Sequence, residues 1–104
     1  MPSNDYQLMI RHILLLQFAA DTSEDQIADM FSQFCDLQTS IDGIQSIDFG
    51  VNNNPEGLHK QFTHAAVVTF TTKKARDQYL PHPVHQQFKN ILTPLLADLI
   101  VLDI

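Results

Sequence analysis

The sequence is poor in the residues that most metal and nucleic-acid sites require. It has one cysteine, Cys35, which excludes an internal disulfide and the usual four-thiolate zinc site. Its six lysines and arginines are outnumbered by twelve acidic residues, giving a net charge of −6, whereas phosphate contacts need clustered basic side chains. We therefore predict no nucleic-acid partner. Cys35 lies in an apolar helical pattern, and we expect a buried, inert thiol.

Local signatures of cofactor binding are also missing. Neither a glycine-rich phosphate loop nor a nucleophile elbow occurs, and no haem or flavin signature is present, so no cofactor is expected. The apolar run ILLLQFAA has the length of a signal-peptide core, but the segment before it carries both Asp5 and Arg11 and lacks a positive bias. Its alternation fits a strand instead. We expect a cytoplasmic protein without a membrane partner.

What the chain does contain is a regular succession of apolar patterns. Apolar runs bounded by turn residues predict four strands: residues 9–18, 44–51, 64–71 and 99–104. Ser23 and Gln26 predict a capping box that begins a helix. The apolar stripe of this helix is Ile27, Met30, Phe31, Phe34, Cys35 and Ile41. Gly43 is expected to end it in a left-handed conformation.

Two further helices are predicted between the third and fourth strands. Residues 72–80 indicate a short helix that stops near Pro81, and Pro83 suits the first turn of a new one. The apolar residues expected to turn inward from this last helix and the residues after it are Phe88, Ile91, Leu92, Leu95 and Leu96. The order strand–helix–strand–strand–helix–strand predicts one α+β domain of the ferredoxin-like type, an antiparallel sheet with helices on one face.

The first strand raises a packing problem that the helices do not solve. Its even positions, among them His12 and Leu14, should face the helices, but the odd positions Ile13 and Leu15 are apolar as well. No predicted helix covers that second face. We therefore expect a homodimer in which the two sheets face each other to form a barrel.

The segment YLPHPVHQQF, residues 79–88, sets two histidines among core-type side chains. His82 precedes Pro83 and is expected to cap the helix that begins there. Histidines at i and i+3 can share a helix face and a metal ion, but Pro83 puts His82 at the helix boundary and the segment has no carboxylate. We predict no metal site. Tyr79 and His85 are six residues apart, and the bend at the prolines could bring their side chains together.

With these residues assigned, the chain resembles the stress-responsive A/B barrel (Dabb) domain family, whose members are dimeric α+β barrels. The resemblance rests on IRHILLLQF, TSEDQ, PEG, FTHAAVVTF, LIVLDI and above all YLPHPVHQQF. It implies a single domain over residues 9–104. Residues 1–8 before it are expected, from their polar character, to form a flexible N-terminus.

The resemblance also implies candidate site residues. In a plant polyketide cyclase of this family, a histidine of the HPxH segment acts as base and an upstream tyrosine polarises a carbonyl during intramolecular aldol closure. These roles fall on His85 and Tyr79, and two further pocket histidines match His12 and His64. Phe34 replaces a tyrosine of the cyclase and Leu96 a tryptophan, so the substrate does not carry over.

The chemistry of aldol closure suits the two principal residues. Histidine has an unperturbed pKa of about 6.5 and is a good base near neutral pH, while a tyrosine hydroxyl can donate to a developing oxyanion. His85 should point into a recess between sheet and helices. The expected lining is Leu14, Leu16, Phe31, Phe34 and Phe88. Because the first and third strands should be antiparallel, His12 and His64 are expected at opposite ends of the interior.

Two functional hypotheses remain open on this sequence. The first is a cofactor-free, cyclase-like enzyme that acts on a small hydrophobic carbonyl or polyketide-like compound. The second is a non-catalytic dimeric stress-response or interaction protein with a filled core. A closed pocket that reaches both His85 and Tyr79 would favour the enzyme.

Overall fold

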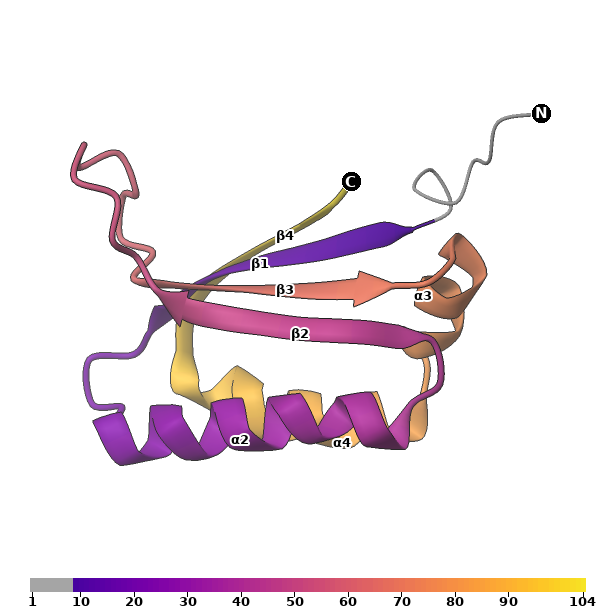
Figure 1. Ribbon diagram of the computed structural model, residues 1–104. Helices are drawn as coiled ribbons and strands as arrows, with labels where there is room; N and C mark the ends of the chain where they lie inside the picture. The colour runs from indigo at the N-terminus through magenta and orange to yellow at the C-terminus, as the bar shows by residue number, and fades with distance from the viewer. Residues whose placement is uncertain (1–8) are drawn as a thin grey trace.

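Four strands form one antiparallel sheet in the computed structural model, which describes residues 9–104 (Figure 1). The strands are β1 (Ile10–Phe18), β2 (Ile44–Val51), β3 (His64–Phe70) and β4 (Leu96–Asp103). They lie in the order β2-β3-β1-β4, so that β1 is central and β4 is at an edge. The four predicted strands are confirmed, although β4 begins earlier than expected. The expectation for residues 1–8 lies outside the described residues.

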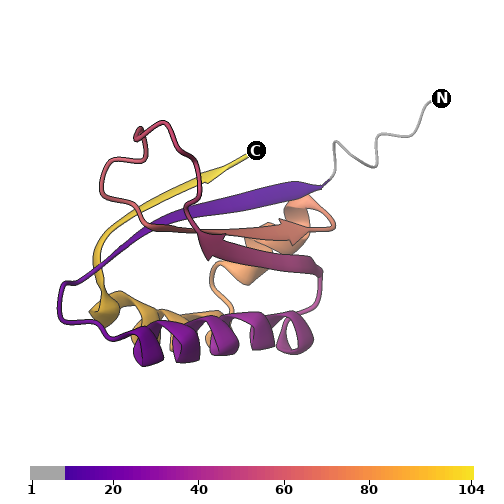
Figure 2. The same ribbon diagram turned by 60° about the vertical axis from the view of Figure 1, so that its left-hand side comes forward.

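The helices cover one face of this sheet. Within residues 9–104 they are α2 (Glu24–Ser40), α3 (Lys73–Tyr79) and α4 (Pro83–Leu92), followed by the short 3-10 helix η1 (Thr93–Leu95). Helices α2 and α4 lie side by side beneath the sheet, and α3 lies at one end of it (Figures 1 and 2). The α+β ferredoxin-like fold is thus confirmed.

Helix α2 begins at the capping box that the sequence predicts. The Ser23 hydroxyl accepts a hydrogen bond from the Gln26 backbone N–H at 3.1 Å, and the Gln26 side chain accepts one from the Ser23 N–H at 2.8 Å. The buried stripe of the helix includes Leu37, whereas Cys35 is only half-buried and corrects the expectation of a buried thiol. Cys35 lies beside the stripe, and partial burial still raises the pKa of its thiol.

Helices α3 and α4 each begin at a side-chain cap. The Thr72 hydroxyl accepts from the Ala75 N–H at 3.0 Å, and His82 Nδ1 accepts from the Val84 N–H at 3.1 Å. The capping role of His82 is therefore confirmed, and Pro83 occupies the first turn of α4.

The inward face of α4 is narrower than the sequence pattern indicated. His85, Phe88 and Leu92 are buried, but Ile91 is 39% exposed, so the expectation that it turns inward is wrong. At 3.6 residues per turn, Ile91 lies about a quarter-turn away from the mean direction of the three buried residues.

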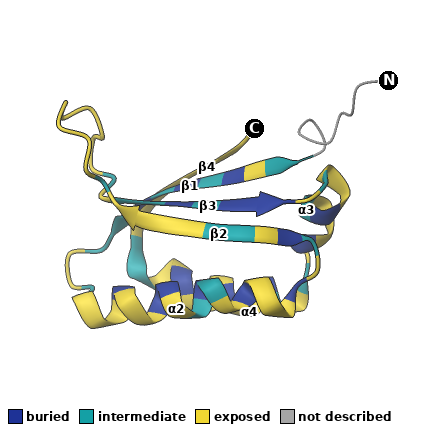
Figure 3. Ribbon diagram, in the orientation of Figure 1, coloured by how far each residue is buried: buried dark blue, intermediate teal, exposed yellow. Residues whose placement is uncertain are grey.

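Among the strands, β3 carries the most buried residues, whereas β2 is largely exposed (Figure 3). Leu14 and Leu16 of β1, Ala66 and Val68 of β3 are buried on the helix side of the sheet, against α2 and α4. The opposite face is also apolar, as predicted, and within the described chain no helix covers it (Figures 1 and 2). Its apolar side chains, assigned by the strand register, are Ile13, Leu15, Ala65, Val67, Ile100 and Leu102. We call this surface the outer face.

Candidate functional site

A cavity of 260 Å³ lies between the sheet and the helices α3 and α4. Its polar end is formed by His12 of β1, Tyr79 of α3 and His85 of α4. Its remaining lining is mostly apolar: Leu14, Phe34, Leu80, Phe88, Lys89, Leu92, Thr93, Leu99 and Val101. Strands β1 and β4 and helices α2, α3 and α4 therefore all contribute to one small space, which we call the central cavity.

The helix break brings Tyr79 and His85 into contact. On an unbroken helix, the side chains of residues six apart point in directions about 120° apart. Here α3 ends at Tyr79 and α4 starts at Pro83, and the ring centroids of Tyr79 and His85 are 3.9 Å apart with an interplanar angle of 28°. The two aromatic rings are stacked beside the cavity.

A backbone carbonyl determines which nitrogen of His85 carries its proton. His85 Nδ1 lies 3.1 Å from the carbonyl oxygen of Leu80. Because a carbonyl oxygen can only accept, Nδ1 donates, and in the neutral ring Nε2 keeps its lone pair. Burial lowers the pKa of His85, and the positive charge of Lys89 acts in the same direction. His85 is thus held as a neutral base near physiological pH.

Tyr79 is held in the opposite form, as a protonated donor. Its side chain is 1% exposed and packs against Phe70 at a centroid distance of 4.9 Å. Burial raises the pKa of its phenol above the usual range. The hydroxyl therefore stays protonated at working pH, as an oxyanion donor must.

His12 is anchored by two charged residues that the sequence analysis did not single out. Cross-strand pairing sets His12 opposite Asp103, and His12 Nδ1 lies 2.7 Å from Asp103 Oδ1. Arg76 Nη1 donates to the other carboxylate oxygen of Asp103 at 2.6 Å. The His12 ring meets the Tyr79 ring edge-on, with centroids 5.9 Å apart. The signal for Asp103 was present, because it is the one acid in the apolar segment LIVLDI.

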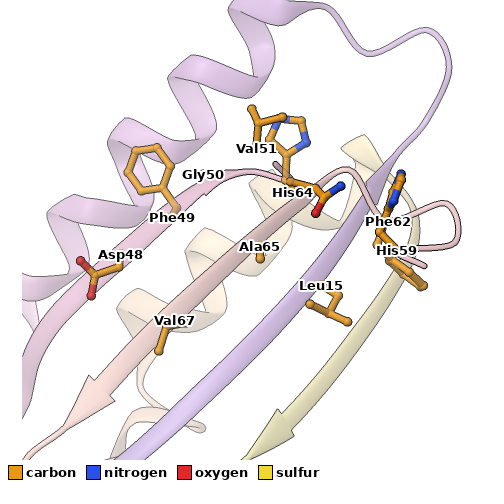
Figure 4. A pocket seen from close by; sticks show the side chains of 11 residues that line it. Leu15, Asp48, Phe49, Gly50, Val51, His59, Phe62, His64, Ala65 and Val67 are labelled. Carbon is orange, nitrogen blue, oxygen red and sulfur yellow. The ribbon is translucent and has the colours of Figure 1, made fainter. Parts of the chain in front are cut away.

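His64 lies away from the central cavity. In the antiparallel register it pairs with Leu16, while His12 pairs with Val68, so the two histidines are four positions apart along the strands, as expected. His64 lines a separate, shallower hollow of 470 Å³ together with Leu15, Phe49, Phe62 and other residues (Figure 4). Burial lowers the pKa of its ring. The structure therefore does not bring His64 to His85.

The predicted lining of the recess around His85 is correct only in part. Leu14, Phe34 and Phe88 line the central cavity with His85, as expected. Leu16 is packed into the core at 1% exposure, and Phe31 stacks on Phe49 at 4.3 Å near His64. Phe31 is one turn of α2 too early to reach His85. The sequence analysis instead missed the β4 residues Leu99 and Val101.

The described residues carry no sign of a metal centre or a membrane span. Among residues 9–104, histidines, cysteines and carboxylates nowhere gather in a group of three or more that could hold a metal ion. None of the helices in this range is both long enough and apolar enough to cross a bilayer.

Comparison with known proteins identifies a matching domain family and related sequences. The family model of the stress responsive A/B barrel domain matches residues 10–104. The chain is 29% identical over 94 residues to the stress-response A/B barrel domain-containing protein HS1 of Arabidopsis thaliana, covering 90% of this chain and 86% of that one. It is 22% identical over 96 residues to olivetolic acid cyclase of Cannabis sativa, covering 92% and 95%.

Solved structures repeat the same fold. The crystal structure of At3g17210 from Arabidopsis thaliana matches with a TM-score of 0.88 and 28% identity, over 91% of this chain and 92% of that one. Hydroxynitrile lyase from Passiflora edulis matches with a TM-score of 0.87 and 22% identity, over 93% and 92%. A dimeric ferredoxin-like protein of unknown function from Jannaschia sp. CCS1 matches with a TM-score of 0.82 and 24% identity, over 92% and 97%.

Proposed function

This chain belongs to the stress responsive A/B barrel domain family, and on that premise we propose that it is a cofactor-free, cyclase-like enzyme. Its substrate would be a small hydrophobic carbonyl or polyketide-like compound, with His85 as the base and Tyr79 as the oxyanion donor. The observation that carries the proposal is the stacked pair of Tyr79 and His85 on the wall of a 260 Å³ cavity. Relatives whose names describe a cyclase and a lyase support it.

The reaction begins with removal of a proton next to a carbonyl group. His85 Nε2, which carries a lone pair while Nδ1 donates to Leu80, takes the proton. The electrons of the broken C–H bond move onto the carbonyl oxygen, and the Tyr79 hydroxyl donates to the enolate oxygen that forms. The apolar lining excludes water and strengthens this hydrogen bond.

The second step closes the ring. The enolate carbon attacks a second carbonyl of the same molecule, forming a C–C bond and an alkoxide, and the protonated His85 returns its proton to that alkoxide. One C–H and one C=O become one C–C bond and one O–H, so no oxidant or reductant is needed. The size of the cavity favours a compact substrate, because typical ligand pockets measure about 300–1,000 Å³.

His12 has a supporting role in this scheme. Asp103 fixes its ring through Nδ1, and the ring packs edge-on against Tyr79. His12 therefore orients the donor. His64 stacks on Phe31 of α2 and lines a hollow away from the central cavity, so it has no part in the chemistry at His85.

The proposed assembly is a homodimer formed through the outer faces of two sheets. The apolar outer face supports it, and so does the dimeric state of the Jannaschia protein. The alternative function, a non-catalytic dimeric stress-response or interaction protein, requires a filled core. The cavity beside Tyr79 and His85 favours the enzyme over that alternative.

The test compares the two histidines of the HPxH segment. Acetonylacetone, a small linear diketone, closes by aldol attack and loss of water to a cyclic enone whose ultraviolet absorbance can be followed. We expect His85→Ala to abolish the enzyme-dependent rate and to keep the circular dichroism spectrum of the folded protein. His82→Ala, which removes only the cap of α4, should keep the rate and lower stability by about 1 kcal/mol.

An equal loss of rate in both variants would contradict the assignment of the base. An absence of turnover in the wild-type protein, with no ligand bound in the cavity, would favour the non-catalytic alternative.

A further inference from the structure

The mouth of the central cavity carries a cation that the proposed chemistry leaves unused. Lys89 follows His85 by four residues on α4, and residues i and i+4 of a helix share one face. It lines the same cavity as His85 while remaining exposed to solvent, and Thr93 lines the cavity one turn further on. Helix α4 thus carries the base and the ammonium along one side, and the hydroxyl follows at the start of η1.

Within the described range of the chain, Lys89 is not engaged by an acidic side chain. The ion pairs found among residues 9–104 are His12–Asp103, Arg76–Asp77 and Arg76–Asp103. Other lysines of the described chain also lack an acidic partner, but among the lysines and arginines only Lys89 lines the central cavity. The last turn of α4 favours a cation through the helix dipole, but the dipole does not require its position beside the cavity.

We propose that Lys89 is a carboxylate-binding residue and that the central cavity takes a carbonyl compound bearing a carboxylate group. The carboxylate contacts the Lys89 ammonium and the Thr93 hydroxyl at the mouth. The apolar body of the ligand lies between Phe34 of α2 and Leu99 and Val101 of β4. Its carbonyl group reaches Tyr79 and His85 at the polar end.

This arrangement deepens the proposed function and rests on it for the role of the carbonyl group. A ligand with a charged end and an apolar body has one orientation in such a cavity, because burying the carboxylate among Leu14, Phe34 and Phe88 would leave a charge without a partner. The carbonyl is then delivered to the two catalytic residues. Lys89 is thereby a specificity-determining residue.

The charge of Lys89 also links ligand binding to the base. Its positive charge contributes to the lowered pKa of His85, alongside burial and the neighbouring His12. A carboxylate bound at Lys89 offsets that charge, so His85 becomes a stronger base when the ligand is in place.

A matched pair of probes tests this site by binding alone. Levulinate carries a ketone and a carboxylate, and levulinamide is its neutral counterpart. At low salt we expect the wild-type protein to bind levulinate about three- to fivefold more tightly than levulinamide, the range of a partly exposed ion pair. Nuclear magnetic resonance titration measures both affinities, and the shifts of Leu92, Leu99 and Val101 locate the ligand.

The control variants remove one positive charge each. Lys89→Gln should abolish the preference for levulinate, and Lys74→Gln, an exposed lysine on α3 that does not line the cavity, should keep it. High salt should reduce the preference in the wild-type protein. The same affinity for both probes, an undiminished preference in Lys89→Gln, or failure of levulinate to bind in the cavity would each overturn the proposal.

Because the test measures binding, it separates the carboxylate site at Lys89 from the proposed catalytic function. Levulinate preference is measured without turnover, and His85→Asn, which removes the base, should retain it. A preference that persists in a protein without cyclase activity would leave the carboxylate site in place and remove the catalytic proposal alone.

Discussion

The carbonyl of Leu80 shows how much chemistry depends on one backbone atom. It accepts from His85 Nδ1 at 3.1 Å and from the Gln86 side-chain amide at 2.7 Å. This carbonyl has no partner within a regular helix because α3 has just ended and α4 has not begun. The helix break therefore both stacks His85 on Tyr79 and selects the tautomer that leaves Nε2 available.

The lowered pKa of His85 has a consequence for stability in acid. In the unfolded chain this histidine takes up a proton near its usual pKa of 6.5, whereas in the folded protein it does so only at lower pH. Between these two pKa values the unfolded state binds more protons than the folded state, and the free energy of unfolding should fall as the pH drops through that interval. Urea unfolding at intervals from about pH 8 to about pH 5 measures this loss.

The control for acid sensitivity is His85→Gln, which keeps a polar side chain and cannot titrate. Its unfolding free energy should change less over the same interval than that of the wild-type protein. His64, whose pKa is also lowered, remains in both proteins and accounts for part of the shared dependence. Identical pH dependence in the two proteins would show that His85 does not carry the effect.

The hydroxyl of Tyr79 can be tested separately from its ring. Tyr79→Phe keeps the packing against Phe70 and His85 and deletes only the donor. We expect the rate of diketone closure to fall about 100-fold, the usual effect of removing one oxyanion donor, while the melting temperature stays close to that of the wild type. Full activity in Tyr79→Phe would assign the donor role to another group.

Sequence reasoning reached the pair of catalytic candidates but not their surroundings. Tyr79, His85 and the capping His82 follow from local proline chemistry and from family resemblance. Asp103 stands out in the sequence as the acid of LIVLDI, but its contacts with His12 and Arg76 could not be found in that way, because they depend on strand register and on the position of α3 relative to β4. Lys89 could not be found from the sequence either, because only its place in the lining of the central cavity distinguishes it from the other exposed lysines.

Among the elements, the turn between α2 and β2 depends most strictly on one residue. Gly43 has a φ of +91°, and a Cβ added there would lie 2.5 Å from Ala75 Cβ of α3. The Thr71 N–H also donates to the Gly43 carbonyl at 2.9 Å. The absence of a side chain at Gly43 therefore allows the end of α2 to approach α3 closely.

Replacing this glycine should cost more than replacing another glycine with a similar backbone. Gly43→Ala adds both left-handed strain and a clash with a backbone-anchored methyl group, for a total of about 2–5 kcal/mol. Gly57→Ala carries the strain alone, since its φ is +75° and open space surrounds it, and should cost about 1–2 kcal/mol. Urea unfolding compares the two, and equal losses would show that the contact with Ala75 relaxes freely.

At the level of elements the sequence was a good guide where signals were local. The capping box at Ser23, the break at Pro81 and Pro83, and the bounds of β2 were all predicted. Errors arose where two elements share a surface. Ile91 was assigned inward from apolar character, but α2 and the sheet leave only the stripe of His85, Phe88 and Leu92 covered.

For the whole molecule, the outer face is an apolar surface without a partner in the described chain. Ile13 and Leu15 of β1 lie there opposite Val67 and Ala65 of β3, and the segment between β2 and β3 rises on the same side (Figure 2). An exposed apolar sheet face of this kind marks an interface or an aggregation hazard. The homodimer proposed above would cover this face.

Charge placed on the outer face should therefore separate the protomers. Leu15→Glu would bury an unpaired carboxylate in the proposed interface and should cost several kcal/mol of dimer stability. Sedimentation at micromolar concentration should show a dimer for the wild type and a monomer for the variant. Ile91→Glu, the same change on the exposed side of α4, should leave the dimer intact.

The oligomeric state of the wild-type protein tests the homodimer independently of any variant. A wild-type monomer under these conditions would contradict the homodimer, and so would a Leu15→Glu protein that stays dimeric.

The edge strand β4 contributes side chains to both the central cavity and the outer face, and it can therefore couple the two. Leu99 and Val101 point toward the central cavity, and between and beyond them Ile100 and Leu102 belong to the outer face. A displacement of β4 therefore changes both the lining of the central cavity and the apolar surface of the outer face. Binding free energies obey reciprocity, so if a ligand steadies β4 and thereby tightens self-association, self-association must raise ligand affinity by the same factor. Dilution below the dissociation constant of the dimer would then release ligand, making affinity a function of protein concentration.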